Sequence, residues 1–170
     1  DLIVCPDGTL NVGSEVEVRT VHTTPHPIFL VEGRLEVNGN PGSPVTFTSD
    51  DPSPSADDWM GLQFRGLGTA ELRDTTISWA DKALDAGDST QLVLDHVTAR
   101  QNRRGLHVLG DGPPVINAAG CAFVENTTYG VFLQGHSSGA NPDVTINDSS
   151  IHGNLSTYDL YAFNYQNALE

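Results

Sequence analysis

Short runs of alternating apolar and polar residues dominate this chain, and helical periodicity is almost lacking. The runs at 15–21 (EVEVRTV), 33–39 (GRLEVNG) and 44–49 (PVTFTS) place apolar side chains at every second position. This period of two is typical of β-strands, because successive side chains of a strand point to opposite faces. Since 17 glycines and 10 prolines punctuate the runs, the pattern predicts an all-β protein.

A run of four residues recurs along the chain at a nearly constant interval. The runs are GLQF at 61–64, ALDA at 83–86, GLHV at 105–108, GVFL at 130–133 and DLYA at 159–162, spaced by 22, 22, 25 and 29 residues. The additional residues of the longer units lie mainly at one turn. A unit of about 22 residues with insertions at one turn predicts a solenoid, whose stacked coils share one core and pair strand on strand about 4.8 Å apart.

Alternation within these runs assigns each side chain to a face of the solenoid. We expect the second and fourth residues of each run to point into the core: Leu62 and Phe64, Leu84 and Ala86, Leu106 and Val108, Val131 and Leu133, Leu160 and Ala162. The third residues then form an outward column, which we call the central column: Gln63, Asp85, His107, Phe132 and Tyr161. Just before the last four runs stand the residues that we predict to form a corner ladder: Asp81, Asn102, Asn126 and Asn154. Their side chains can satisfy turn backbone groups and bond one another from coil to coil.

These features together resemble a known repeat family. The succession of PVTFTS, WMGLQF and the units with a corner Asn is similar to the right-handed parallel β-helix repeat of bacterial and archaeal surface proteins. The resemblance covers about residues 30–165 and implies a pectate-lyase-like coil with three sheets, a fold shared by polysaccharide lyases, glycoside hydrolases, adhesins and inert stalks. We therefore expect one right-handed parallel β-helix domain over 1–170. Within it, 1–30 would form an N-terminal cap of first coils, 31–165 the stacked coils, and 166–170 a tail that resembles a cloning remnant.

Charge narrows the choice of partners. The formal net charge of −14 arises from 22 Asp and Glu residues against 8 Lys and Arg residues. Such a surface repels phosphate, so we expect no nucleic-acid partner and no attraction to anionic lipid. No apolar run is long enough to span a bilayer, which argues against membrane insertion. An extracellular or cell-surface protein fits these features, as a mature form or as an excised part of a longer chain.

The central column provides the best candidate binding face. Asp85 and His107 are predicted to lie one rung apart, where an Asp can orient and charge a His for acid–base chemistry. Phe132 and Tyr161 are predicted to follow them, where their rings can stack on sugars. The alternative is an ordinary cross-strand pair beside two exposed aromatic side chains.

Three more candidates flank this column. Arg103 and Arg104 occupy slots that later units fill with Thr, Tyr and Leu, which favours a solvent-facing pair at a corner. The alternative is a grip on uronate carboxylates, because the guanidinium fork matches carboxylate geometry. His136 lies in the long loop that follows the run at 130–133.

Comparison with the enzymes of this fold argues against catalysis. Polygalacturonase-like hydrolases carry an Asp pair, a Gly-His-Gly and an Arg-x-Lys signature, whereas here GHS stands at 135–137 and Arg-x-Lys does not occur. The LDH at 94–96 resembles the apolar-Asp-His motif of pectate lyases, without a recognisable Arg base or calcium-binding Asp set. We expect a non-catalytic protein. The alternative is a polysaccharide lyase or glycoside hydrolase acting on acidic polysaccharide through Asp85, His107 and Arg104.

An acidic loop raises the question of a metal. The stretch 50–58 (DDPSPSADD) contains four carboxylates, Asp50, Asp51, Asp57 and Asp58, and hard cations such as calcium take oxygen ligands from such clusters. The stretch lacks the spacing of known calcium loops, so a solvated acidic loop is favoured and no cofactor is expected. His22 and His26, in HTTPHP, form a second and weaker metal signal.

The sequence as a whole favours an extracellular or cell-surface β-helix module with a non-catalytic role, in carbohydrate binding, adhesion or scaffolding. The expected partner is a polysaccharide or cell-surface glycan. Because a solenoid presents open strand edges at its ends, end-to-end self-association and further domains of a longer protein are additional hypotheses.

Overall fold

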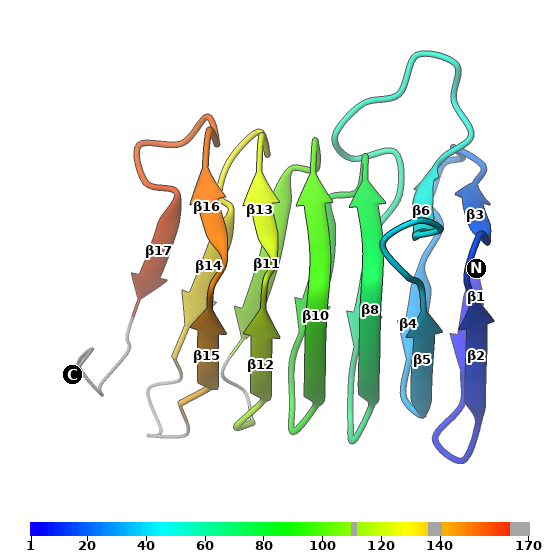
Figure 1. Cartoon of the computed structure of the whole chain (residues 1–170), viewed down its shortest axis with the longest axis horizontal. Coiled ribbons are helices and arrows are strands. Elements are labelled where there is room, and N and C mark those ends of the chain that lie inside the picture. Colours follow the sequence, from blue (N-terminus) through cyan, green and yellow to red (C-terminus); the bar gives the residue numbers. More distant parts are fainter. Residues whose placement is uncertain (110–111, 136–140, 164–170) are drawn as a thin grey trace.

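The structure of the protein is a computed structural model that describes residues 1–109, 112–135 and 141–163. Within these residues the chain forms strands β1 to β17 and no helix, and the strands are stacked side by side along one axis (Figure 1). No helix in the described part is therefore long and apolar enough to cross a membrane. The all-β prediction is confirmed.

The strands form two parallel sheets. The seven-stranded sheet contains, in spatial order, β1 (Leu2–Val4), β4 (Phe29–Val31), β7 (Leu62–Phe64), β9 (Lys82–Ala86), β11 (Arg104–Leu109), β14 (Val131–Gln134) and β17 (Leu160–Phe163). The main path of the ten-stranded sheet contains β15 (Asp143–Asn147), β12 (Val115–Ala119), β10 (Gln91–Arg100), β8 (Thr69–Ser78), β5 (Arg34–Asn38) and β2 (Thr9–Gly13). Its remaining strands are β3 (Glu17–Thr20), β6 (Val45–Ser49), β13 (Ala122–Val124) and β16 (Ser150–His152).

Each coil contributes one strand to the seven-stranded sheet and then returns through the ten-stranded sheet. The result is a β-solenoid of about six turns, with a spacing of roughly 25 residues. This confirms the predicted parallel β-helix. Residues 1–30 supply β1, β2 and β3, which pair in parallel with β4, β5 and β6 of the next coil.

The ten-stranded sheet combines two of the three sheets that the resemblance implies. Strands β8 and β10 are each ten residues long and remain paired on both sides of one residue, Asp74 in β8 and His96 in β10. Both residues have a positive φ, 41° and 54°, and both drop out of the register. The coil therefore turns at this residue while the hydrogen-bonded ladder continues, so two faces belong to one sheet.

The core lies between the two sheets and is built from the predicted inward residues. Leu62, Phe64, Leu84 and Leu106 are fully buried, as are the corresponding residues of β14 except for slight exposure of Leu133. In β17 the register pairs Leu160 with the buried Val131, so Leu160 lies on the predicted face, but it is 41% exposed. Strand β17 is the last in the sheet and pairs only with β14 among the described residues, so only one side of it is covered.

Glycine at the start of the recurring runs has a steric cause. A Cβ at Gly105 would lie 2.4 Å from the Gly130 carbonyl oxygen, and a Cβ at Gly130 would lie 2.7 Å from the Phe123 carbonyl oxygen. Neighbouring coils approach so closely at this corner that a side chain there would separate them.

An asparagine ladder follows the same corner from coil to coil. The Ala80 N–H donates to Asn102 Oδ1 (2.9 Å), the Asn102 N–H donates to Asn126 Oδ1 (3.1 Å), and the Asn126 N–H donates to Asn154 Oδ1 (2.9 Å). The side-chain amides also bond one another, at 3.2 Å from Asn102 to Asn126 and at 2.9 Å from Asn126 to Asn154. Asn102 and Asn126 are fully buried, so the ladder satisfies polar groups that water does not reach.

Asp81 lies outside this ladder, contrary to the prediction. The residue that bonds Asn102 is Ala80, 22 residues earlier, and a methyl side chain cannot extend a ladder of amides. Asp81 is one residue beyond the ladder position, which Ala80 occupies. Its carboxylate instead forms an ion pair with Arg103, with 2.9 Å between Oδ1 and Nη1.

Candidate functional site

The central column exists in the structure as five residues in register. In the seven-stranded sheet Gln63 pairs with Asp85, Asp85 with His107, His107 with Phe132, and Phe132 with Tyr161. Each pair comes from neighbouring parallel strands, so the side chains lie one rung apart on the same face. The alternation of each run puts this face opposite the core.

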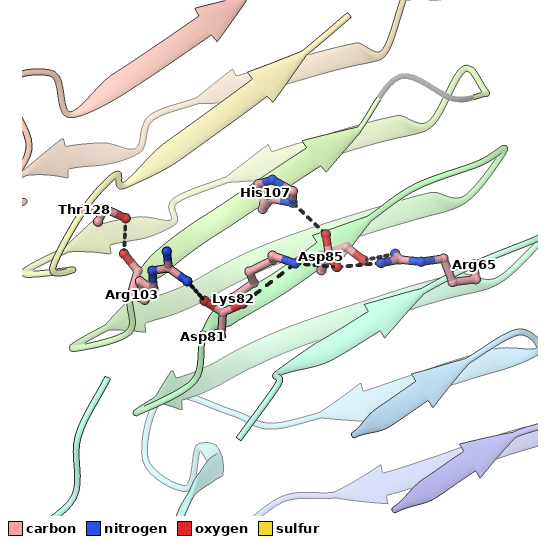
Figure 2. Close-up of polar contacts among 7 residues, drawn as sticks. All are labelled: Arg65, Asp81, Lys82, Asp85, Arg103, His107 and Thr128. Carbon is pink, nitrogen blue, oxygen red and sulfur yellow. Dashed lines mark hydrogen bonds and ion pairs between the residues drawn. The ribbon is translucent and has the colours of Figure 1, made fainter. Parts of the chain in front are cut away.

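Asp85 is the centre of a polar cluster on this face (Figure 2). Its Oδ1 lies 2.7 Å from His107 Nδ1, and its Oδ2 accepts a hydrogen bond of 2.5 Å from Arg65 Nη2. Lys82 Nζ approaches Oδ2 to 3.4 Å. A second guanidinium nitrogen of Arg65 donates to the Asp85 carbonyl oxygen at 2.9 Å. Three donors from β9, from β11 and from the residue after β7 therefore surround one carboxylate.

The cluster is covered although it lies on the outer face. Asp85 is fully buried and His107 is only 4% exposed. Burial alone would raise the pKa of Asp85, but the hydrogen bond from His107 and the charges of Arg65 and Lys82 hold it far below its ordinary range. Asp85 is therefore a carboxylate at neutral pH.

His107 is neutral at the same pH. Burial is the largest influence and lowers the pKa of His107, with Lys82 and Arg104 acting in the same direction, and the opposing effect of Asp85 does not compensate. The sequence-based expectation that Asp85 charges His107 is therefore wrong, because burial and two cations outweigh one anion. In the neutral ring the proton on Nδ1 faces the Asp85 carboxylate, which leaves the lone pair on Nε2.

A strip of aromatic rings continues the column beyond His107. The His107 and Phe132 rings stack with 5.1 Å between centroids, and the Phe132 and Tyr161 rings stack at 5.5 Å. Tyr129 lies 5.4 Å from both Phe132 and Tyr161, and Tyr158 lies 6.2 Å from Tyr161. Tyr158 is 58% exposed, and the rings of Tyr129, Phe132 and Tyr161 are half-buried. The strip is thus a ring surface that solvent reaches.

A second set of residues runs beside the central column, and we call it the flanking column: Lys82, Arg104, Tyr129 and Tyr158. Each stands directly before one of the recurring runs, and the register pairs Arg104 with Lys82. Both columns change from charged to aromatic in the same direction along the solenoid. Arg104 marks the change, because its guanidinium carbon lies 5.5 Å from the centroid of the Phe132 ring.

The two adjacent arginines have different environments. Arg103 is about half exposed and pairs with Asp81, which fits the prediction of a solvent-facing corner residue. Arg104 is half-buried, and its Nε–H is enclosed without a hydrogen-bond partner among the described residues. The solvent-facing interpretation is therefore wrong for Arg104, because its strand β11 directs it toward the rings.

The other candidates lie elsewhere. His136 lies outside the described residues. Asp95 and His96 form an exposed pair, with 2.8 Å between Oδ1 and Nδ1, on the ten-stranded sheet. The four carboxylates of the acidic loop do not act together. Asp50 lies beside Arg19 and Asp57 is exposed, whereas Asp51 and Asp58 approach His22.

Sequence reasoning missed Arg65, Lys82, Tyr129 and Tyr158, although signals for all four were present. Arg65 follows Gln63 by two residues and so lies on the same face of its strand. The other three share one position of the repeat, directly before the recurring run. Aligning that position would have revealed the flanking column.

Comparison of the chain with protein-family models, with curated proteins and with solved structures finds no match. By its fold and its candidate site, the protein is a parallel β-solenoid that carries a cationic and aromatic surface on one sheet.

Proposed function

We propose that this protein is an extracellular or cell-surface β-helix module, of the pectate-lyase-like kind, that binds an acidic polysaccharide without cleaving it. One observation carries the proposal: a half-exposed strip of four aromatic rings continues directly into a cationic cluster on one sheet. Protein surfaces that bind sugars combine an apolar ring face with placed polar groups, because a sugar ring has one apolar face and a polar rim.

The two halves of the surface have complementary roles in this proposal. The rings of Phe132, Tyr158 and Tyr161 provide a platform on which successive sugar residues stack. Arg104 borders the platform, and its half-buried guanidinium, 5.5 Å from the Phe132 ring centroid, would pair with a carboxylate of the ligand. This accounts for an acidic ligand on a protein whose net charge is −14, since the positive charge is local.

Burial of the Asp85–His107 pair supports binding rather than catalysis. His107 is 4% exposed and its ring is stacked against Phe132, so a substrate atom has little access to it. Asp85 is enclosed by Arg65, Lys82 and His107, which together stabilise the sheet under the binding surface.

Calorimetric titration with polygalacturonate and with a neutral polysaccharide tests the proposal. We expect the protein to prefer the acidic chain and expect Phe132→Ala and Tyr161→Ala each to weaken binding about tenfold, which is about 1.4 kcal/mol. Val93→Ala is the matched control, because Val93 is 49% exposed on the ten-stranded sheet. Unchanged affinity in both aromatic variants, or equal loss in the control, contradicts the proposal and favours a purely structural spacer.

A second candidate function, polysaccharide lyase, is favoured by the 2.7 Å contact between Asp85 and His107. A neutral His with its free lone pair on Nε2 is a base, and the adjacent Arg104 can neutralise the carboxylate of a uronate whose proton is removed. Incubation with polygalacturonate, followed by ultraviolet absorbance of unsaturated chain ends, separates the two functions. Absorbance that rises with the wild type and not with His107→Gln supports the lyase, whereas a flat trace for both leaves the binding function.

A further inference from the structure

A second polar cluster lies far from the aromatic strip, where two connections leave neighbouring coils. One connection follows β3 and contains His22, and the other follows β6 and contains Asp51 and Asp58. Strands β3 and β6 are paired in parallel and end together, and the long loop after β6 extends beyond that edge (Figure 1). The cluster therefore joins two coils.

The register explains why His22 and Asp51 meet. Thr20 at the end of β3 pairs with Ser49 at the end of β6. His22 and Asp51 each follow their strand end by two residues, so they occupy equivalent positions on adjacent coils. Parallel strands are about 4.8 Å apart, which brings the two side chains to within reach of one ion.

Asp58 reaches the same place on the return of the loop, because the next residue anchors the chain. Trp59 is fully buried, its Nε1–H donates to the Ser78 carbonyl oxygen at 2.9 Å, and its backbone bridges to Ala80. The Asp58 N–H donates to the Trp79 carbonyl oxygen at 3.1 Å. With its backbone held in this way, Asp58 faces His22 and Asp51.

Asp58 is a buried carboxylate without an adequate counter-charge. Its side chain is 2% exposed, Oδ1 accepts a hydrogen bond of 2.7 Å from Ser55, and Oδ2 is buried without a hydrogen-bond partner among the described residues. A buried carboxylate oxygen that lacks a partner is costly, because burial removes the water that would otherwise solvate it.

The neighbouring His22 does not by itself satisfy Asp58. Its Nδ1 lies 3.3 Å from Asp58 Oδ1, which is longer than a good N–H···O hydrogen bond of about 2.7–3.2 Å. No Lys or Arg forms an ion pair with Asp58 or Asp51 in the described part of the chain. A cation between the three side chains would supply the missing charge.

We propose that His22, Asp51 and Asp58 form a binding site for one divalent transition-metal ion of the zinc type. Their ligand atoms all lie within 4.8 Å of one another. Two ligands of one zinc ion are at most about 4.2 Å apart, twice a bond of about 2.1 Å, so a small movement of the exposed His22 ring closes the site.

An imidazole ligand decides the class of metal. Calcium takes 6–8 oxygen ligands, whereas a set of one imidazole and two carboxylates suits zinc and its first-row neighbours. The proposed ligand set thus combines Asp51 and Asp58 with a histidine from the neighbouring coil. Asp50 and Asp57 are not part of it. The ion would link the connection after β3 to the long loop after β6 and so stabilise both.

Isothermal titration of the whole metal-free chain with zinc chloride tests the site. We expect one ion per chain, and we expect His22→Ala and Asp51→Asn each to weaken zinc binding at least tenfold. Asp50→Asn and Asp57→Asn are the matched controls, since they remove the same charge from the same loop, and they should retain wild-type affinity. At the same zinc concentration, the melting temperature should rise by less in His22→Ala than in the wild type and both controls.

Other outcomes overturn the proposal. If the wild type does not bind zinc, the cluster is only an ion pair. If His22→Ala binds zinc as tightly as the wild type, the ion lies elsewhere, for example at the exposed Cys5. If calcium binds more tightly than zinc and His22→Ala does not change this, the loop is an oxygen-only site. Because His22 is exposed and its replacement removes no core contact, these results do not depend on a variant that fails to fold.

Discussion

At the scale of single residues, the repeat makes neighbours of side chains that are 22 residues apart. Asp85 and His107 occupy the same position of consecutive units, so their contact follows from the alignment of the runs at 83–86 and 105–108. The charge states of Asp85 and His107 do not follow from this alignment. His107 is neutral because it is buried and because Lys82 and Arg104 lie near it, and neither fact is visible in its own run.

This environment predicts a pH dependence of stability. The pKa of His107 is lower in the folded protein than its value of about 6.5 in the unfolded chain, so the unfolded chain binds more protons in this range. The free energy of unfolding should therefore be highest above about pH 6.5 and should decrease as the pH falls through the folded-state pKa.

Urea unfolding of the wild type and of His107→Gln between about pH 7.5 and 5 measures this effect. The variant should show a smaller slope, because glutamine retains a hydrogen-bond donor for Asp85 but does not titrate. The other histidines are common to both proteins and cancel in the comparison. Equal slopes would show that His107 has no part in the pH dependence.

At the scale of elements, the corner ladder adds side-chain hydrogen bonds to the backbone pairing of the two sheets in holding successive coils together. Three backbone N–H groups, of Ala80, Asn102 and Asn126, find their acceptors on the side chain of the next coil. The Asn126 amide also donates to the Ala99 carbonyl oxygen at 3.1 Å. Each amide thus connects two coils and a turn at once.

Replacement of Asn126 by Ala should lower the free energy of unfolding by about 3 kcal/mol. The change removes the side-chain acceptor of the buried Asn102 N–H and a donor to the Ala99 carbonyl oxygen, and a buried polar group that loses its partner costs about 1–3 kcal/mol. Asn117→Ala is the control, because Asn117 is exposed on the ten-stranded sheet, and it should change stability by less than about 0.5 kcal/mol. If urea unfolding shows equal losses of stability for the two variants, the ladder contributes no more to stability than an exposed asparagine.

At the scale of the whole molecule, both ends of the seven-stranded sheet expose apolar residues. Ile3 in β1 is 57% exposed, and Leu160 and Phe163 in β17 are 41% and 48% exposed. Within the described residues each of these strands pairs on one side only. A second copy placed head to tail would continue the sheet, and such an interface does not close into a ring by itself.

We therefore predict concentration-dependent association of the protein. Light scattering coupled to size-exclusion chromatography should show a mass that rises with concentration, and Leu160→Glu should reduce the rise by placing a charge at the contact. High salt should strengthen association of the wild type, since it screens the repulsion between copies of charge −14. A constant monomer mass at the highest concentration would refute head-to-tail stacking.

The β-solenoid, its core, the central column and the three asparagines of the corner ladder could all be predicted from the sequence. All of these depend on one strand period and one repeat length, and both can be read directly from the spacing of residues such as Leu84, Leu106 and Asn126. A one-residue displacement was enough to defeat the prediction for Asp81.

Which groups are buried and which loops meet depends on contacts between coils that the repeat pattern does not contain. The neutral state of His107, the separate environments of Arg103 and Arg104, and the meeting of His22 with Asp58 all depend on side chains from other coils. Burial and charge are sums over neighbours in space, whereas a repeat fixes only the neighbour one rung away. The acidic loop shows the difference, because its four carboxylates look equivalent in sequence and just two of them face a histidine.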